Sequence, residues 1–98
     1  MQLPNKPFHL QSREERSTYL EDLTRELYAA HLELSEVRVQ YLWAYSQAYK
    51  AAQSPHVGGR IQEAEIAAAA IKEDELALVG RIDALCAMRD YLALILRG

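Results

Sequence analysis

The stretch Ser54-Pro55-His56-Val57-Gly58-Gly59 separates two long segments that contain no other proline. Proline cannot continue a helix, and glycine tolerates the backbone conformations found at helix ends and in tight turns. We therefore predict a turn over residues 54–59, between one helix over about 13–53 and a second over about 60–96. A connection this short favours antiparallel neighbours. The predicted fold class is all-α, an antiparallel two-helix hairpin of coiled-coil type.

The segment before this turn has the features of one long helix. Ser12 and Glu15 have the spacing of a capping box, in which each side chain binds a backbone N–H of the first turn. Neither proline nor glycine occurs from Ser12 to Ser54. The apolar residues alternate at spacings of three and four, which is typical of the a and d positions of a coiled coil. This seam consists of Leu20, Leu23, Leu27, Ala30, Leu34, Val37, Tyr41, Ala44, Ala48 and Ala51.

The segment after the turn carries a matching seam that two charged residues interrupt. Its apolar members are Ile61, Ala64, Ala68, Ile71, Leu78, Ile82, Leu85, Leu92 and Leu96. Glu75 and Arg89 occupy the interrupting positions. A charged residue at a seam position can fix register or partner choice at a cost in stability. The alternative is that the stripe drifts around the helix and leaves both residues exposed, and this is the outcome we expect.

Both segments carry more apolar surface than a two-helix hairpin can cover. A second stripe lies nearly opposite the first seam; this outer stripe consists of Tyr28, Leu32, Ser35, Val39, Leu42, Ser46 and Tyr49. Trp43 and Tyr45 lie between the two stripes. The later segment has its own second stripe in Ile66, Leu76, Ala84, Ala87, Tyr91 and Leu94. Apolar residues on several sides of a helix are normally buried.

Self-association is the simplest way to cover these faces. Two hairpins related by a two-fold axis would form a four-helix bundle, that is, a homodimer. The alternative is that a helix from a different protein fills the gap. In either case the residues expected to make the contacts are Tyr28, Leu32, Val39, Leu42, Trp43, Tyr45, Tyr49, Tyr91 and Leu94.

No set of residues indicates catalysis, a metal or a cofactor. His9, His31 and His56 lie far apart and lack partners at the spacing of zinc ligands. Cys86 is the only cysteine, so an internal disulfide is excluded. The net charge of -3 lacks the basic excess usual in strong nucleic-acid binders. We therefore expect an interaction module, and no enzyme.

The first eleven residues form a separate part of the predicted organisation. Pro4 and Pro7 disfavour helix in the residues before them, so residues 1–11 are predicted to be an extended arm and residues 12–98 the hairpin. The arm has no apolar core of signal-peptide length, and no apolar run is long enough for a membrane helix. These features predict a cytoplasmic protein without a membrane partner.

The last part of the second segment carries a residue pattern that resembles a known class of helical hairpins. The pattern Arg81-Ile82-Asp83-Ala84-Leu85, continued by Arg89 and by Leu96-Arg97, resembles small helical-hairpin accessory proteins of tailed bacteriophages. This resemblance implies binding to, and inhibition or modulation of, a host or phage protein. The rival is a single-stranded nucleic-acid-binding accessory protein, in which aromatic residues stack on bases. Its candidate basic residues are Arg13, Arg16, Arg25, Arg38 and Lys50.

Overall fold

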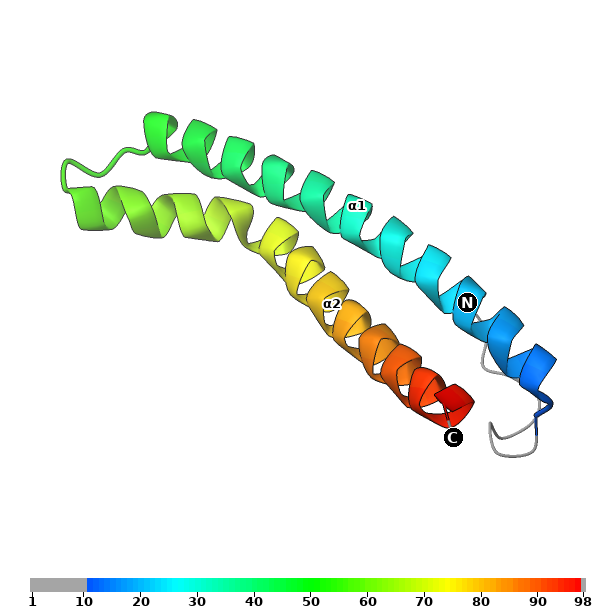
Figure 1. Ribbon diagram of the computed structural model, residues 1–98. Helices are drawn as coiled ribbons and strands as arrows, with labels where there is room; N and C mark the ends of the chain where they lie inside the picture. The colour runs from blue at the N-terminus through cyan, green and yellow to red at the C-terminus, as the bar shows by residue number, and fades with distance from the viewer. Residues whose placement is uncertain (1–10, 98) are drawn as a thin grey trace. The chain divides into compact units, whose positions relative to one another are not determined.

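Two long helices account for nearly all of residues 11–97, the part of the chain that the computed structural model describes. Helix α1 is Arg13–Ala51 and helix α2 is Val57–Arg97 (Figure 1). They pack against each other as a hairpin, which confirms the predicted all-α fold class. The predicted N-terminal arm, apart from Gln11, lies outside the described residues.

The hairpin divides into two compact units, which we describe separately. The terminal unit contains residues 11–31 and 80–97, and so combines the start of α1 with the end of α2. The turn unit is Leu32–Val79, and combines the end of α1 with the start of α2. Within each unit, therefore, the two helical segments lie alongside each other and run in opposite directions (Figure 1).

Leucine and isoleucine side chains at seam positions form the core of the terminal unit. Its buried apolar residues are Leu23, Leu27 and Ala30 from α1 with Ile82, Leu85 and Leu92 from α2. Leu23 and Leu92 are the largest of these with no exposed surface, at 0% each. An ion pair between Glu26 of α1 and Arg81 of α2 lies beside this core. The predicted seam is thus the buried face of both helices here.

Smaller side chains form the core of the turn unit. Ala64, Ala68 and Leu78 of α2 are buried together with Leu34 of α1. Of the other predicted seam residues of α1 in this unit, Val37, Tyr41, Ala44 and Ala48 are half-buried, whereas Ala51, at the end of the helix, is exposed. Alanine side chains allow two helices to approach closely, but each buries little apolar area. This unit is therefore held by less apolar burial than the terminal unit, and polar contacts matter more in it.

The start of α1 agrees with the prediction, whereas the start of α2 does not. The Ser12–Glu15 capping box is present: the Glu15 amide donates to Ser12 Oγ at 3.1 Å and the Ser12 amide to Glu15 Oε1 at 3.4 Å. The connection, however, is residues 52–56, since α1 ends at Ala51 and α2 begins at Val57. Gly58 and Gly59 lie inside α2 and have no positive φ. Glycine permits a turn conformation without requiring it, so the prediction of a turn over 54–59 ended too late.

Side chains from the first turns of α2 hold this connection. The Glu63 carboxylate accepts hydrogen bonds from the amides of Gln53 and Ser54, at 3.3 and 3.1 Å. The Arg60 Nε donates to the Ser54 carbonyl at 2.9 Å. Hydrogen bonds that involve an ionised group are stronger than those between neutral groups. The backbone between the helices therefore has bonding partners that the helix ends alone would not supply.

Gly59 meets a steric requirement that Gly58 and Gly80 do not, and this gives a prediction. A Cβ at Gly59 would lie 2.1 Å from Ser54 Oγ and 2.6 Å from Ser54 Cβ. Gly59→Ala should therefore destabilise the protein by about 1–3 kcal/mol, the usual range for overpacking. Gly80→Ala is the matched control, because nothing lies within 4 Å of its added Cβ. That change should stabilise by about 1 kcal/mol through helix propensity. Urea denaturation of both variants is the measurement, and effects of the same sign would contradict the prediction.

Candidate interaction surfaces

Most of the residues predicted to make contacts lie on the surface of the hairpin. Seven of the nine are exposed, with 50–69% of their surface accessible: Tyr28, Leu32, Val39, Leu42, Trp43, Tyr91 and Leu94. Tyr45 and Tyr49 are half-buried. The packing of α1 against α2 therefore leaves these large apolar side chains uncovered in the single chain.

The outer stripe is best developed in the turn unit. Leu32, Val39 and Leu42 lie along one side of α1 and are all exposed. Trp43, with 66% of its surface exposed, lies next to them. A depression of about 300 Å³ continues this surface and is lined by Tyr45, Ser46, Tyr49 and Lys50. An apolar side chain from another molecule would find both a flat apolar surface and a hollow on this side of α1.

Helix α2 contributes separate exposed apolar residues. In the turn unit these are Ile66 and Leu76, both in the second stripe identified from the sequence, and Ile61, a predicted seam residue that is 37% exposed and not buried. Val57 is also exposed; it was not among the predicted contact residues, because it was assigned to the turn and lies instead at the start of α2. The remaining members of the α2 stripe are exposed and belong to the terminal unit: Ala84, Ala87, Tyr91 and Leu94.

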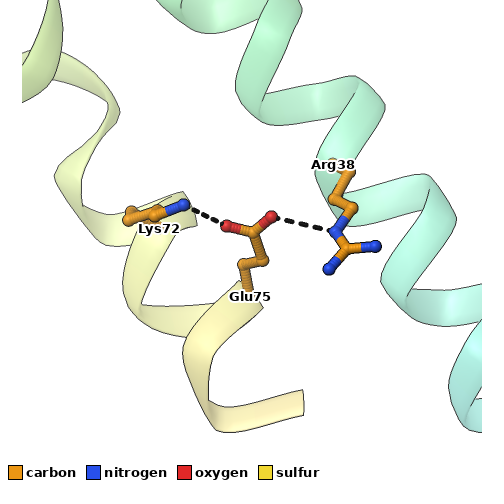
Figure 2. Close-up of polar contacts among 3 residues, drawn as sticks. All are labelled: Arg38, Lys72 and Glu75. Carbon is orange, nitrogen blue, oxygen red and sulfur yellow. Dashed lines mark hydrogen bonds and ion pairs between the residues drawn. The ribbon is translucent and has the colours of Figure 1, made fainter. Parts of the chain in front are cut away.

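A cluster of charged side chains occupies the seam of the turn unit (Figure 2). Glu75 of α2 points between two cations: its Oε1 lies 3.1 Å from the Nε of Arg38 on α1, and its Oε2 lies 2.5 Å from the Nζ of Lys72. Glu75 is buried, with 8% of its surface exposed. The Lys72 ammonium also lies 5.2 Å from the centre of the Tyr41 ring. The carboxylate thus links the two helices.

This burial corrects the prediction that the seam drifts and leaves Glu75 exposed. Glu75 follows Ile71 by four residues and precedes Leu78 by three, so the heptad spacing stays in phase through it. Two cations within bonding distance offset the cost of removing the carboxylate from water. The other interrupting residue, Arg89, is half-buried and lies 3.2 Å from the carboxylate of its neighbour Asp90.

The cluster shifts the pKa values of Glu75 and Lys72 so that both side chains favour their charged forms. The hydrogen bond from Lys72 is the main cause that lowers the pKa of Glu75 below its ordinary 4.5; Arg38 adds to this, and burial opposes it. The same hydrogen bond is the main cause that raises the pKa of Lys72, again against the effect of burial. A lowered carboxyl pKa means that the cluster stabilises the fold fully above the ordinary pKa. This contribution is lost as the pH falls through the lowered value.

The basic residues named for nucleic-acid binding are divided between the two units. Arg13, Arg16 and Arg25 belong to the terminal unit, whereas Arg38 and Lys50 belong to the turn unit. The Arg25 guanidinium lies 3.8 Å from the Asp22 carboxylate, and Arg38 pairs with Glu75. At least two of the five charges are therefore already matched by carboxylates.

Searches for other kinds of site and for related proteins gave no match. Within residues 11–97, no three His, Cys, Asp or Glu side chains are grouped so that they could hold a metal ion. Neither helix in that range combines the length and apolar character needed to cross a membrane. Comparison of the chain with protein-family models, curated proteins and solved structures found no similar protein.

Proposed function

We propose that this chain is a non-enzymatic interaction module that self-associates through its exposed helical faces and binds a partner protein with the surface that remains. The observation that carries this proposal is the exposure of large apolar side chains along α1 in the turn unit, above all Leu32, Val39 and Leu42. Each such side chain left in water forgoes about 1.5–3 kcal/mol of burial free energy. Association is the process that recovers it.

The spacing of these residues indicates what kind of surface covers them. Together with Ser35, Leu32, Val39 and Leu42 follow one another at spacings of three, four and three residues, as in a coiled-coil seam, so the complementary surface is another helix. Trp and Tyr, which dominate the energetics of many protein interfaces, flank the stripe at Trp43 and Tyr45. A second copy of the hairpin can supply this helix, and such copies are present wherever the protein is in solution. Two hairpins about a two-fold axis then give an assembly of four helices.

A partner protein would use the faces that self-association leaves open. Such binding could also inhibit the partner, since a helix of this chain can occupy a groove that the partner's own ligand needs. The rival function, binding of single-stranded nucleic acid, draws less support from the charges. Arg25 and Arg38 are paired with carboxylates, and binding to phosphates would have to compete with those pairs.

The test of this proposal is a double variant, Leu32→Glu with Leu42→Glu. Four buried carboxylates at a two-fold interface would be prohibitively costly, so light scattering should give the mass of one chain where the native protein gives twice that mass. Far-UV circular dichroism should remain helical, because both residues face away from the α1–α2 seam. An unchanged mass for the variant, or a native protein with the mass of one chain, would contradict the proposal.

A further inference from the structure

We infer that residues 32–49 of the outer stripe bind the same residues of a second copy, with the two α1 helices antiparallel and a two-fold axis between Val39 and Leu42. This inference rests on the self-association proposed above and specifies its surface and direction. All of the residues involved belong to one helix and to the turn unit. The stripe over this range is about 27 Å long at 1.5 Å per residue.

The order of side chains along the stripe is the same in both directions. From Leu32 to Tyr49 the sizes read large, small, large, large, small, large, for Leu32, Ser35, Val39, Leu42, Ser46 and Tyr49. Antiparallel pairing about the proposed axis sets Leu32 opposite Tyr49, Ser35 opposite Ser46 and Val39 opposite Leu42. Each contact then occurs twice, as a two-fold interface requires, and the interface closes with two copies.

The two serines select this register over its neighbours. In the proposed register, Ser35 of one copy faces Ser46 of the other, so the two polar positions of the stripe meet each other. A shift by one heptad would set Ser35 against Val39 or Ser46 against Leu42. Those registers pair a polar position of one copy with an aliphatic position of the other, so the order of the stripe favours the proposed register.

Shape and charge along the edges agree with the same arrangement. The depression at Tyr45, Ser46, Tyr49 and Lys50 comes level with Leu32 and Ser35 of the second copy, and Leu32 is exposed and able to enter it. Glu36 and Lys50 lie on one edge of the stripe, where antiparallel pairing brings Lys50 of each copy within about 7.5 Å, along the helix axis, of Glu36 of the other. These long side chains can span that offset, and symmetry repeats the pair.

Arg38 lies on the opposite edge of the stripe, and Glu75 of the charge cluster offsets part of its charge. Antiparallel pairing brings the Arg38 side chains of the two copies toward the same edge, where two unmatched cations would repel each other. Glu75 lies 3.1 Å from the Arg38 guanidinium of its own hairpin, so its carboxylate offsets part of the positive charge of Arg38 and Lys72. The buried carboxylate of the seam thus weakens the repulsion between the two copies at this edge.

Disulfide trapping between two single-cysteine chains tests the inference directly. Both chains carry Cys86→Ala, which removes the only native cysteine; one also carries Leu32→Cys and the other Tyr49→Cys. After mixing and mild oxidation, the disulfide between positions 32 and 49 should form several-fold faster than either same-position disulfide. A dominant 32–32 disulfide would mean parallel helices and would overturn the inference, as would no disulfide at all.

A matched change on the other helix separates this inference from the proposed function. Ile66→Glu with Leu76→Glu places the same charges on exposed positions of α2 in the same unit, and should leave the mass at two chains. Dissociation of this variant would overturn the α1 interface. If the native protein has the mass of two chains but the single-cysteine chains form no 32–49 disulfide, only the direction and surface inferred here are wrong. If it has the mass of one chain, the proposed function fails as well.

Discussion

Replacing Leu92 with alanine is expected to lower the free energy of unfolding by about 2–5 kcal/mol, the range for large-to-small changes at buried positions. Leu92 has 0% of its surface exposed and lies on the seam of α2 in the terminal unit. Truncation removes its burial energy and leaves a cavity among side chains that pack from both helices. A small domain has a total stability of about 5–15 kcal/mol, so this loss is a large part of it.

The measurement is urea denaturation followed by circular dichroism, at one fixed protein concentration because association also adds stability. Leu76→Ala is the control: it is the same change on the same helix at an exposed position. Surface substitutions of this kind are usually within about 0.5 kcal/mol of the native protein. Equal losses for the two variants would mean that the seam is not where the structure has it.

Reversal of charge at Glu75 is expected to have the second large effect. Glu75→Lys would bring a third cation to a site that already holds the Arg38 guanidinium and the Lys72 ammonium. The lysine would be buried with no carboxylate partner in the cluster, and a buried unpaired charge is strongly unfavourable. We expect a pronounced fall in the midpoint of thermal unfolding.

Two further variants show whether the cluster causes that fall. Glu73→Lys makes the same change at an exposed position one half-turn away and should leave the midpoint nearly unchanged. Arg38→Glu combined with Glu75→Lys restores an ion pair between α1 and α2 and should recover part of the loss. Glu75→Gln should also remove the cluster's share of the acid destabilisation, because its amide does not titrate. An equal fall for Glu73→Lys and Glu75→Lys would assign the effect to net charge instead.

The buried faces of the helices could be predicted from the sequence because heptad spacing is a strong signal. The positions predicted for the seam include Leu23, Leu27 and Ala30 on α1 and Ile82 and Leu85 on α2, and all are buried. The capping box at Ser12 was also predictable, because it depends only on the local spacing of Ser12 and Glu15.

The errors fall where two physical effects compete. Gly58 and Gly59 were assigned to the turn, although glycine also adopts helical dihedral angles when the surrounding hydrogen bonds require them. Glu75 was expected to be exposed because an isolated carboxylate avoids the core. Its burial depends on Arg38, which is distant in sequence and comes close only when α1 and α2 are paired. The unbroken spacing through Glu75 was the signal that could have indicated this.

The exposed apolar surface could be predicted in outline, but what covers it could not. Each helix carries two apolar stripes, whereas a two-helix hairpin can bury only one stripe of each helix. Leu32, Leu42 and Leu94 belong to the second stripes and are exposed. The identity of a partner depends on the other molecule's surface, which this sequence does not contain. Only a partner identical to this chain can be inferred from the chain itself, and the order of side chains from Leu32 to Tyr49 is what permits it.

Sedimentation equilibrium of the unmodified protein, over a wide range of concentrations, tests most directly whether the hairpin has more apolar surface than it can cover alone. We predict a mass of twice the 11.1 kDa chain, with dissociation toward a single chain only at high dilution. A mass of one chain at every concentration would contradict it, since Leu32, Val39 and Leu42 would then remain in contact with water.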